Sequence, residues 1–155
     1  MSTSLANRKP RKLPILAALL LGGLSGLGLY TFNYAEGAAY FSDDPKACLN
    51  CHVMREPFED WSHSSHKAVA ACNDCHSPRS FPNNWLAKGV NGWNHSVAFT
   101  TGNFQDPIRI RKFNSQIVQK NCVACYRGLV TIVHRSSPRQ ERSCVSCHGN
   151  VGHGK

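Results

Sequence analysis

Length, composition and charge set the first limits on this chain. It has 155 residues, eight cysteines and a formal net charge of +9, and its length suits one small domain. Aliphatic residues are sparse outside an apolar N-terminal stretch, so the remainder cannot bury a large core of its own side chains. The composition therefore argues against a domain held together by aliphatic packing alone.

The first predicted element is a membrane helix. Residues 1–12 are polar and end in four basic side chains, whereas residues 13–32 carry no charge. A helix of about 20 residues is long enough to cross the hydrocarbon core of a bilayer. Basic residues before the span and acidic residues after it place residues 1–12 in the bacterial cytoplasm. A cleaved signal peptide is the alternative, but the apolar run is long for one, so we predict a retained single-pass anchor in the inner membrane.

Pairs of cysteines dominate the rest of the chain. Two cysteines two residues apart and followed at once by histidine form the attachment pattern of a c-type haem, with the imidazole under the iron. Three of the four pairs have that histidine, and one has tyrosine instead. The pairs are Cys48 and Cys51 before His52, Cys72 and Cys75 before His76, Cys122 and Cys125 before Tyr126, and Cys144 and Cys147 before His148. The pattern predicts a cytochrome with four covalently attached haems.

Zinc sites, disulfides and thiol-redox centres also use such cysteine pairs. None of these sites needs a histidine directly after the second cysteine, so haem is the preferred interpretation. Covalent haem and the absence of an unpaired cysteine both indicate the periplasm. Residues 33–155 are therefore predicted to form a periplasmic multihaem domain.

Four haems also explain the sparse core and the basic charge. Porphyrins are large and apolar, so short helices and loops can fold around them. Each haem carries two propionates, and four haems would add about eight negative charges and bring the protein near neutrality. Basic residues such as Arg109, Arg111 and Lys112 are then propionate partners, a docking surface or a solvated face. Nucleic-acid binding is the weaker explanation, and no nucleic acid is expected as a partner.

Short helices are predicted between the motifs. Residues 43–45, Asp-Asp-Pro, have the composition of a helix start and lead directly into the first motif. Residues 107–121 form an amphipathic helix that leads into the third motif. Between residues 81 and 104, aromatic side chains interleave with polar ones, which suits either the membrane–water interface or packing against haem. The predicted fold class is mainly α with much irregular structure.

The chain resembles the NapC/NirT family of quinol dehydrogenases. The likeness rests on one N-terminal membrane helix, a first motif of the form Cys-x-x-Cys-His-x-Met at residues 48–54, and four motifs in a short periplasmic domain. Residues 42–54, 61–66 and 92–100 are most similar to small subunits of cytochrome c nitrite reductase. The resemblance implies that the chain oxidises menaquinol and passes electrons to a periplasmic multihaem catalytic subunit, which reduces nitrite to ammonium.

The resemblance also implies axial ligands for the haem irons. Met54, rather than His52, would bind the first iron, whose other face lies open beside the quinol pocket. The implied ligands of the second haem are His76 and His153, and those of the fourth haem are His148 and His66. His63 is an alternative to His66 as a ligand of the fourth haem. For each of these histidines, the alternative is a surface position without a bond to iron.

The third haem departs from the family pattern. Tyr126 stands where its histidine is expected. Tyrosinate can hold haem iron, and His134 is a second candidate. A side chain from the partner subunit is the third candidate.

The implied quinol site departs from the pattern as well. Asn91 stands where relatives commonly carry aspartate, and Asn84 stands where they often carry lysine. Asparagine cannot accept either of the two protons that quinol oxidation releases. Lys88, His95 and Asp60 are the nearby groups left to do so.

The leading hypothesis is a membrane-anchored quinol dehydrogenase subunit of a nitrite reductase complex, in which haems carry the redox chemistry. An electron-relay cytochrome without a quinol site is one alternative, favoured by the two asparagines. A quinol dehydrogenase that serves another periplasmic reductase is a second. Gly22 and Gly26 have the spacing that lets membrane helices approach closely, which leaves a homodimer within a larger complex open.

Overall fold

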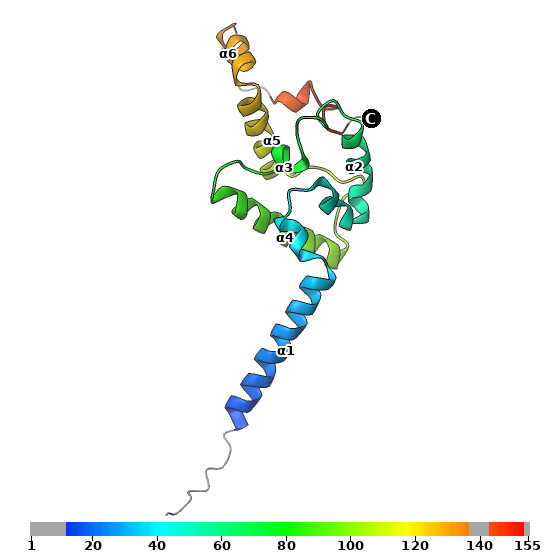
Figure 1. The fold of residues 1–155 in the computed structure, drawn as a ribbon, viewed down its shortest axis with the longest axis vertical. Coiled ribbons are helices and arrows are strands. Elements are labelled where there is room, and N and C mark those ends of the chain that lie inside the picture. The colour runs from blue at the N-terminus through cyan, green and yellow to red at the C-terminus, as the bar shows by residue number, and fades with distance from the viewer. Residues whose placement is uncertain (1–11, 137–142, 154–155) are drawn as a thin grey trace, which may run out of the picture. The chain divides into compact units, whose positions relative to one another are not determined.

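The computed structural model describes residues 12–136 and 143–153 and contains no β-strand among them. The chain divides into two compact units, residues 1–38 and residues 39–155. The prediction of a mainly helical fold is confirmed. The α-helices are α1 (Lys12–Tyr34), α2 (Arg55–Ser62), α3 (Cys72–His76), α4 (Asn83–Thr101), α5 (Lys112–Cys125) and α6 (Arg127–Ser136) (Figure 1). Four short 3₁₀ helices accompany them: η1 (Gly37–Phe41), η2 (Pro45–Asn50), η3 (His52–Met54) and η4 (Cys144–Ser146).

Helix α1 accounts for nearly all of the first unit that the structure describes. It has 23 residues, an 18-residue stretch within it has a mean hydropathy of 1.8, and none of its side chains is buried. At 1.5 Å per residue such a helix is about 35 Å long, enough to cross a bilayer. A helix that is apolar on every side and exposed on every side has no protein to pack against, so lipid is the solvent that fits it. The helix is therefore consistent with the predicted membrane anchor.

Three of the four cysteine pairs in the second unit lie on or beside short helical turns, and the third pair lies at the C-terminal end of α5. A helix starts after Asp44, as the sequence predicts, and it is the 3₁₀ helix η2. The Asp44 carboxylate caps this helix by accepting a hydrogen bond from the Lys46 backbone N–H (2.9 Å), and Pro45 occupies the first turn. The helix predicted over residues 107–121 begins only at Lys112, because Arg111 has an extended backbone (φ −75°, ψ 152°). It then continues through the third motif to Cys125.

Very little of the second unit is buried. Among the described residues, Ala87 and Ile117 are the only buried apolar side chains, and Ser77 and Asn121 are the only buried polar ones. Asn121 donates hydrogen bonds to the carbonyl oxygens of Cys75 (3.0 Å) and Ser77 (2.8 Å). This side chain therefore fastens α5, immediately before the third motif, to the end of the second motif. Helix α6 follows directly on α5 and extends beyond it (Figure 1).

Candidate functional site

Each cysteine pair lies next to the following pair in space, so the spatial order of the four pairs is the same as their order in the sequence. The thiols of Cys48 and Cys72 hydrogen-bond to each other, so the first motif adjoins the second. Burial raises the pKa of Cys122, and nearby Cys144 and Cys75 raise it further, so the third motif lies close to both the fourth and the second. Helix α5 packs against both α3 and η4, in agreement with this order. Groups attached to the four pairs would form one continuous row.

The residues present fit haem. All eight cysteines are free thiols, available for thioether bonds. The described residues contain no group of three or more His, Cys, Asp or Glu that could hold a metal ion. A cavity of about 550 Å³, lined by Ser65 and residues 145–151, adjoins the fourth motif. Large apolar groups would also supply the core that the side chains lack.

His76 and His153 face each other across the gap expected for a shared iron. Metal–imidazole bonds of about 2 Å on opposite sides of one metal hold the two ring centroids about 6 Å apart, and here the centroids are 6.0 Å apart. His153 Nδ1 donates a hydrogen bond to the Pro57 carbonyl oxygen (2.9 Å), which leaves Nε2 as the ligand atom. Burial and nearby His153 lower the pKa of His76, which favours the neutral imidazole that binds metal.

His66 and Tyr126, which the sequence analysis assigns to different haems, lie in direct contact. His66 Nδ1 donates to the Val151 carbonyl oxygen (3.1 Å), so Nε2 carries the lone pair and accepts from the Tyr126 hydroxyl (2.9 Å). The Nδ1 bond orients the ring in the way that metal-binding histidines are usually held. His63 instead bonds to the Glu59 carbonyl oxygen of its own helix (2.9 Å) and is exposed, which favours the choice of His66.

The remaining candidate ligands lie on or beside the motifs. Met54 is half-buried at the end of η3, whereas His52 at its start is exposed. His148 follows η4 and lines the cavity beside the fourth motif. His134 lies in the last turn of α6, and its side chain is outside the part of the molecule that the structure describes.

The structure brings the three quinol-site candidates together on one face of α4. Lys88, Asn91 and His95 are three and four residues apart and therefore share a helix face. Each of them has a polar partner from elsewhere in the second unit. The pairs are Lys88 Nζ with Asp43 Oδ1 (3.4 Å), Asn91 Oδ1 accepting from Asn114 Nδ2 (3.0 Å), and His95 Nδ1 with Tyr40 Oη (2.6 Å).

Asp60, the other proton acceptor considered from the sequence, lies on α2 and not on this face. Asn84 lies in the first turn of α4, where its Oδ1 is buried without a hydrogen-bond partner. Sequence reasoning missed Tyr40, Asp43 and Asn114. No motif marks these residues, because each acts through a partner far away in the sequence.

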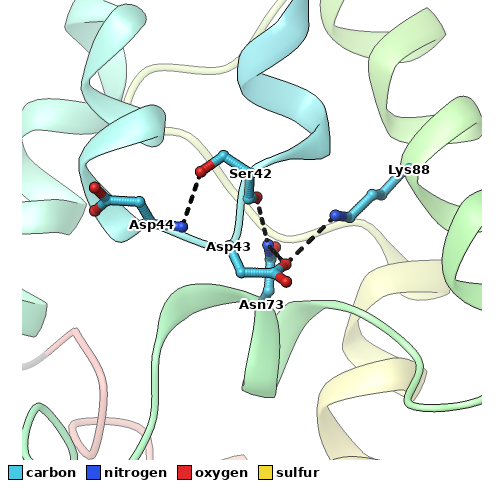
Figure 2. Close-up of polar contacts among 5 residues, drawn as sticks. All are labelled: Ser42, Asp43, Asp44, Asn73 and Lys88. Atoms are coloured by element: carbon cyan, nitrogen blue, oxygen red, sulfur yellow. Dashed lines mark hydrogen bonds and ion pairs between the residues drawn. The ribbon is translucent and has the colours of Figure 1, made fainter.

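Figure 2 shows the polar cluster around Asp43. Asp43 Oδ1 accepts hydrogen bonds from Asn73 Nδ2 (2.8 Å) and Lys88 Nζ (3.4 Å), and Asn73 Nδ2 also reaches the Ser42 carbonyl oxygen (3.1 Å). Because Asn73 lies inside the second motif, the cluster ties that motif to α4 and to the segment before the first motif. The Asn73 hydrogen bond, followed by the Lys88 charge, lowers the pKa of Asp43.

Replacing Asp43 with asparagine should reduce the acid sensitivity of the fold. A carboxyl group with a lowered folded-state pKa stabilises the protein above its ordinary pKa, and this stabilisation is lost as pH falls through the lowered value. Asp43→Asn keeps an oxygen for Asn73 but loses the charge that faces Lys88. We expect the drop in thermal midpoint between pH 7 and pH 3 to be smaller in the variant. An equal drop in both proteins would contradict the assignment.

Together, a membrane-length helix and four Cys-x-x-Cys pairs in a domain with few buried side chains are consistent with a membrane-anchored c-type cytochrome. The chain belongs to the NapC/NirT cytochrome c family: the model of that family's N-terminal region matches residues 9–123. The resemblance noted from the sequence is thereby confirmed. The matched region covers the first two motifs and the first cysteine of the third.

Named relatives agree with this assignment. The chain is 38% identical over 141 residues to the cytochrome c-type protein NrfH of Wolinella succinogenes, covering 84% of this chain and 80% of that protein. It is 23% identical to the cytochrome c-type protein TorY of Escherichia coli O157:H7, of which it spans 43%. The crystal structure of the cytochrome c nitrite reductase NrfHA complex bound to the HQNO inhibitor matches with a TM-score of 0.64 and 29% identity, covering 88% of this chain and 90% of that one.

Proposed function

We propose that this chain is the quinol-oxidising, membrane-anchored cytochrome c subunit of a nitrite reductase complex. The similarity to NrfH covers most of both proteins, and the similar solved chain belongs to a complex with a nitrite reductase and an inhibitor. The observation that carries the proposal is the polar face of α4. Its residues Lys88 and His95 pair with Asp43 and Tyr40, which immediately precede the first haem motif.

The chain's own residues would hold four haems and direct electrons along them. Each cysteine pair anchors one porphyrin, and bound haem supplies iron that accepts and donates single electrons. Met54 would bind the first iron, His76 and His153 the second. The fourth would take His148 and His66, and the third Tyr126 or His134. The sequential contacts of the cysteine pairs support a single path from the first motif to the fourth.

Helix α1 determines the membrane topology that we propose for the chain. Residues 13–32 would span the inner membrane, residues 1–12 would lie in the cytoplasm, and residues 33–155 would lie in the periplasm. This places the haem domain on the side where c-type haem is attached. Menaquinol would enter from the membrane, and the catalytic subunit of the reductase would dock on the periplasmic domain.

Reduction by a quinol is the direct test. Membranes that contain the haem-loaded protein should retain it after a high-salt wash. After detergent extraction, a menaquinol analogue should reduce its haems in the absence of oxygen, as measured by the α-band absorbance, and HQNO should slow that reduction. Dithionite, which needs no quinol site, gives the total reducible haem. Haems that dithionite reduces and the quinol does not would overturn the proposal and favour a plain electron-relay cytochrome.

A further inference from the structure

Tyr40 and His95 form the shortest polar contact on the α4 face. Tyr40 Oη lies 2.6 Å from His95 Nδ1, although the two residues are 55 positions apart. The Tyr40 ring also lies beside Gly92, one turn before His95: a Cβ atom built at Gly92 would be in ordinary van der Waals contact with the ring, at 3.7 Å. The Phe41–Trp85 ring contact, with centroids 5.5 Å apart, fixes the same segment to α4.

The pair lies beside the first haem motif. Burial, followed by the nearby Cys51 and Cys48, raises the pKa of Tyr40 to about 12. In the haem-loaded protein these sulfurs are uncharged thioethers and do not affect the pKa by their charge. What remains is that the Tyr40 phenol lies close to the first cysteine pair. Tyr40 therefore stays protonated at any ordinary pH, at a place where quinol would meet the first haem.

His95 has the properties of a proton acceptor. Burial, with a smaller effect from the charge of Arg111, lowers its pKa, so the neutral imidazole predominates near pH 7. Tyr40 and Arg111 are the groups of the second unit that act on it. His95 is nevertheless exposed, so a ligand can reach its ring.

We infer that His95 is the base that accepts the protons of menaquinol and that Tyr40 is the residue that positions it. The inference rests on the proposed function. The other candidates on this face are poorer bases: Asn91 has no basic atom, and Lys88 is paired as an ammonium group with Asp43. His95 is thus the neutral base on this face.

His95, held by Tyr40, can accept both protons that quinol oxidation releases, one after the other. Oxidation of one quinol to quinone breaks two O–H bonds and releases two protons and two electrons, and the attached haems would accept the electrons one at a time. In the tautomer whose Nδ1–H donates to the Tyr40 oxygen, Nε2 has the free lone pair and takes the first proton. Loss of that proton to water restores the neutral ring, which then takes the second proton. The imidazolium formed each time is stabilised by its hydrogen bond to Tyr40.

Two variants and one control test the pair in the haem-loaded, detergent-extracted protein. His95→Gln should lower the rate of reduction by the menaquinol analogue by about 100-fold, the low end of general-base effects. Tyr40→Phe should lower it by about tenfold, because a hydrogen bond to a charged group is lost. Ser96→Ala, which removes only a bond to the Gly92 carbonyl oxygen within the helix, should leave the rate unchanged. The haem spectrum should be unchanged in all three, and the HQNO dissociation constant should be unchanged in Ser96→Ala.

The pH profile separates a proton acceptor from a structural residue. In the unaltered protein the quinol rate should fall as pH drops through the His95 pKa, because the imidazolium cannot accept a proton. His95→Gln should abolish this acid limb, and Tyr40→Phe should move it to lower pH. If the quinol reduces the unaltered protein and both variants keep its rate and profile, the inference is overturned while the proposed function stands. If the quinol does not reduce the unaltered protein, the proposed function itself fails.

Discussion

Replacing Tyr126 with histidine should convert the third haem from oxygen to nitrogen ligation and raise its reduction potential. The third cysteine pair lies between the second and fourth pairs, and Tyr126 follows it directly at the end of α5. A phenolate oxygen stabilises ferric iron relative to imidazole, so this haem should be the hardest of the four to reduce. Potentiometric titration of the visible spectrum should show one component move upward in Tyr126→His.

The contact between Tyr126 and His66 places a further condition on iron binding by either side chain. His66 Nε2 accepts from the Tyr126 hydroxyl at 2.9 Å while its Nδ1 bonds to Val151, so both ring nitrogens are engaged. A nitrogen that accepts this hydrogen bond cannot bind iron at the same time. If either side chain is a haem ligand, haem loading would have to break this hydrogen bond.

Tyr126→Phe is the matched control, since it removes the oxygen and keeps the ring. If Tyr126 binds iron, this variant should lose the oxygen-ligand signature of the ferric spectrum, and Tyr126→His should gain a bis-nitrogen one. If the phenol only bonds to His66, the phenylalanine variant should keep the spectrum and lose about 0.5–1.5 kcal/mol of stability. Intact-mass measurement of the denatured chain should show four haems, and three would end the assignment.

Local sequence patterns account for what could be predicted. The membrane helix follows from an uncharged run, and the haem turns follow from motifs of five to seven residues, so neither depends on how distant segments meet. The helix start at Asp44 was predicted for the same reason, because its cap and proline are adjacent in the sequence. The start of α5 was misplaced by five residues, since backbone angles at Arg111 decide it and no side-chain signal marks them.

The contacts that build the candidate site could not be predicted in this way. Tyr40 with His95, Asp43 with Lys88, and His66 with Tyr126 join residues 45 to 60 positions apart. Amphipathic periodicity identifies a buried face only when there is a side-chain core to bury it, and this domain has almost none. Lys88 and His95 can be named as candidates from the sequence, but their partners depend on how the loops fold around the haem motifs.

Replacing Met54 should change the first haem more than replacing His52 does. Met54 ends η3 half-buried, its backbone N–H bonded to the Cys51 carbonyl oxygen (2.9 Å), while His52 in the same turn is exposed. Met54→Leu nearly conserves volume, so packing and the start of α2 should survive while the thioether is lost. Because a thioether ligand favours reduced iron, the first haem of this variant should become harder to reduce, and reduction by the menaquinol analogue should slow.

The comparison with His52→Ala decides which side chain binds the first iron. His52→Ala should lower the yield of attached haem, because the motif loses its histidine, but the haem that is attached should keep the spectrum of the unaltered protein. Met54→Ala should repeat the spectral change of Met54→Leu, which separates ligand loss from a packing effect. Near-infrared magnetic circular dichroism reports a methionine–iron bond directly. If the unaltered protein lacks that signal, and the ferric spectrum changes in His52→Ala but not in Met54→Leu, His52 rather than Met54 is the ligand.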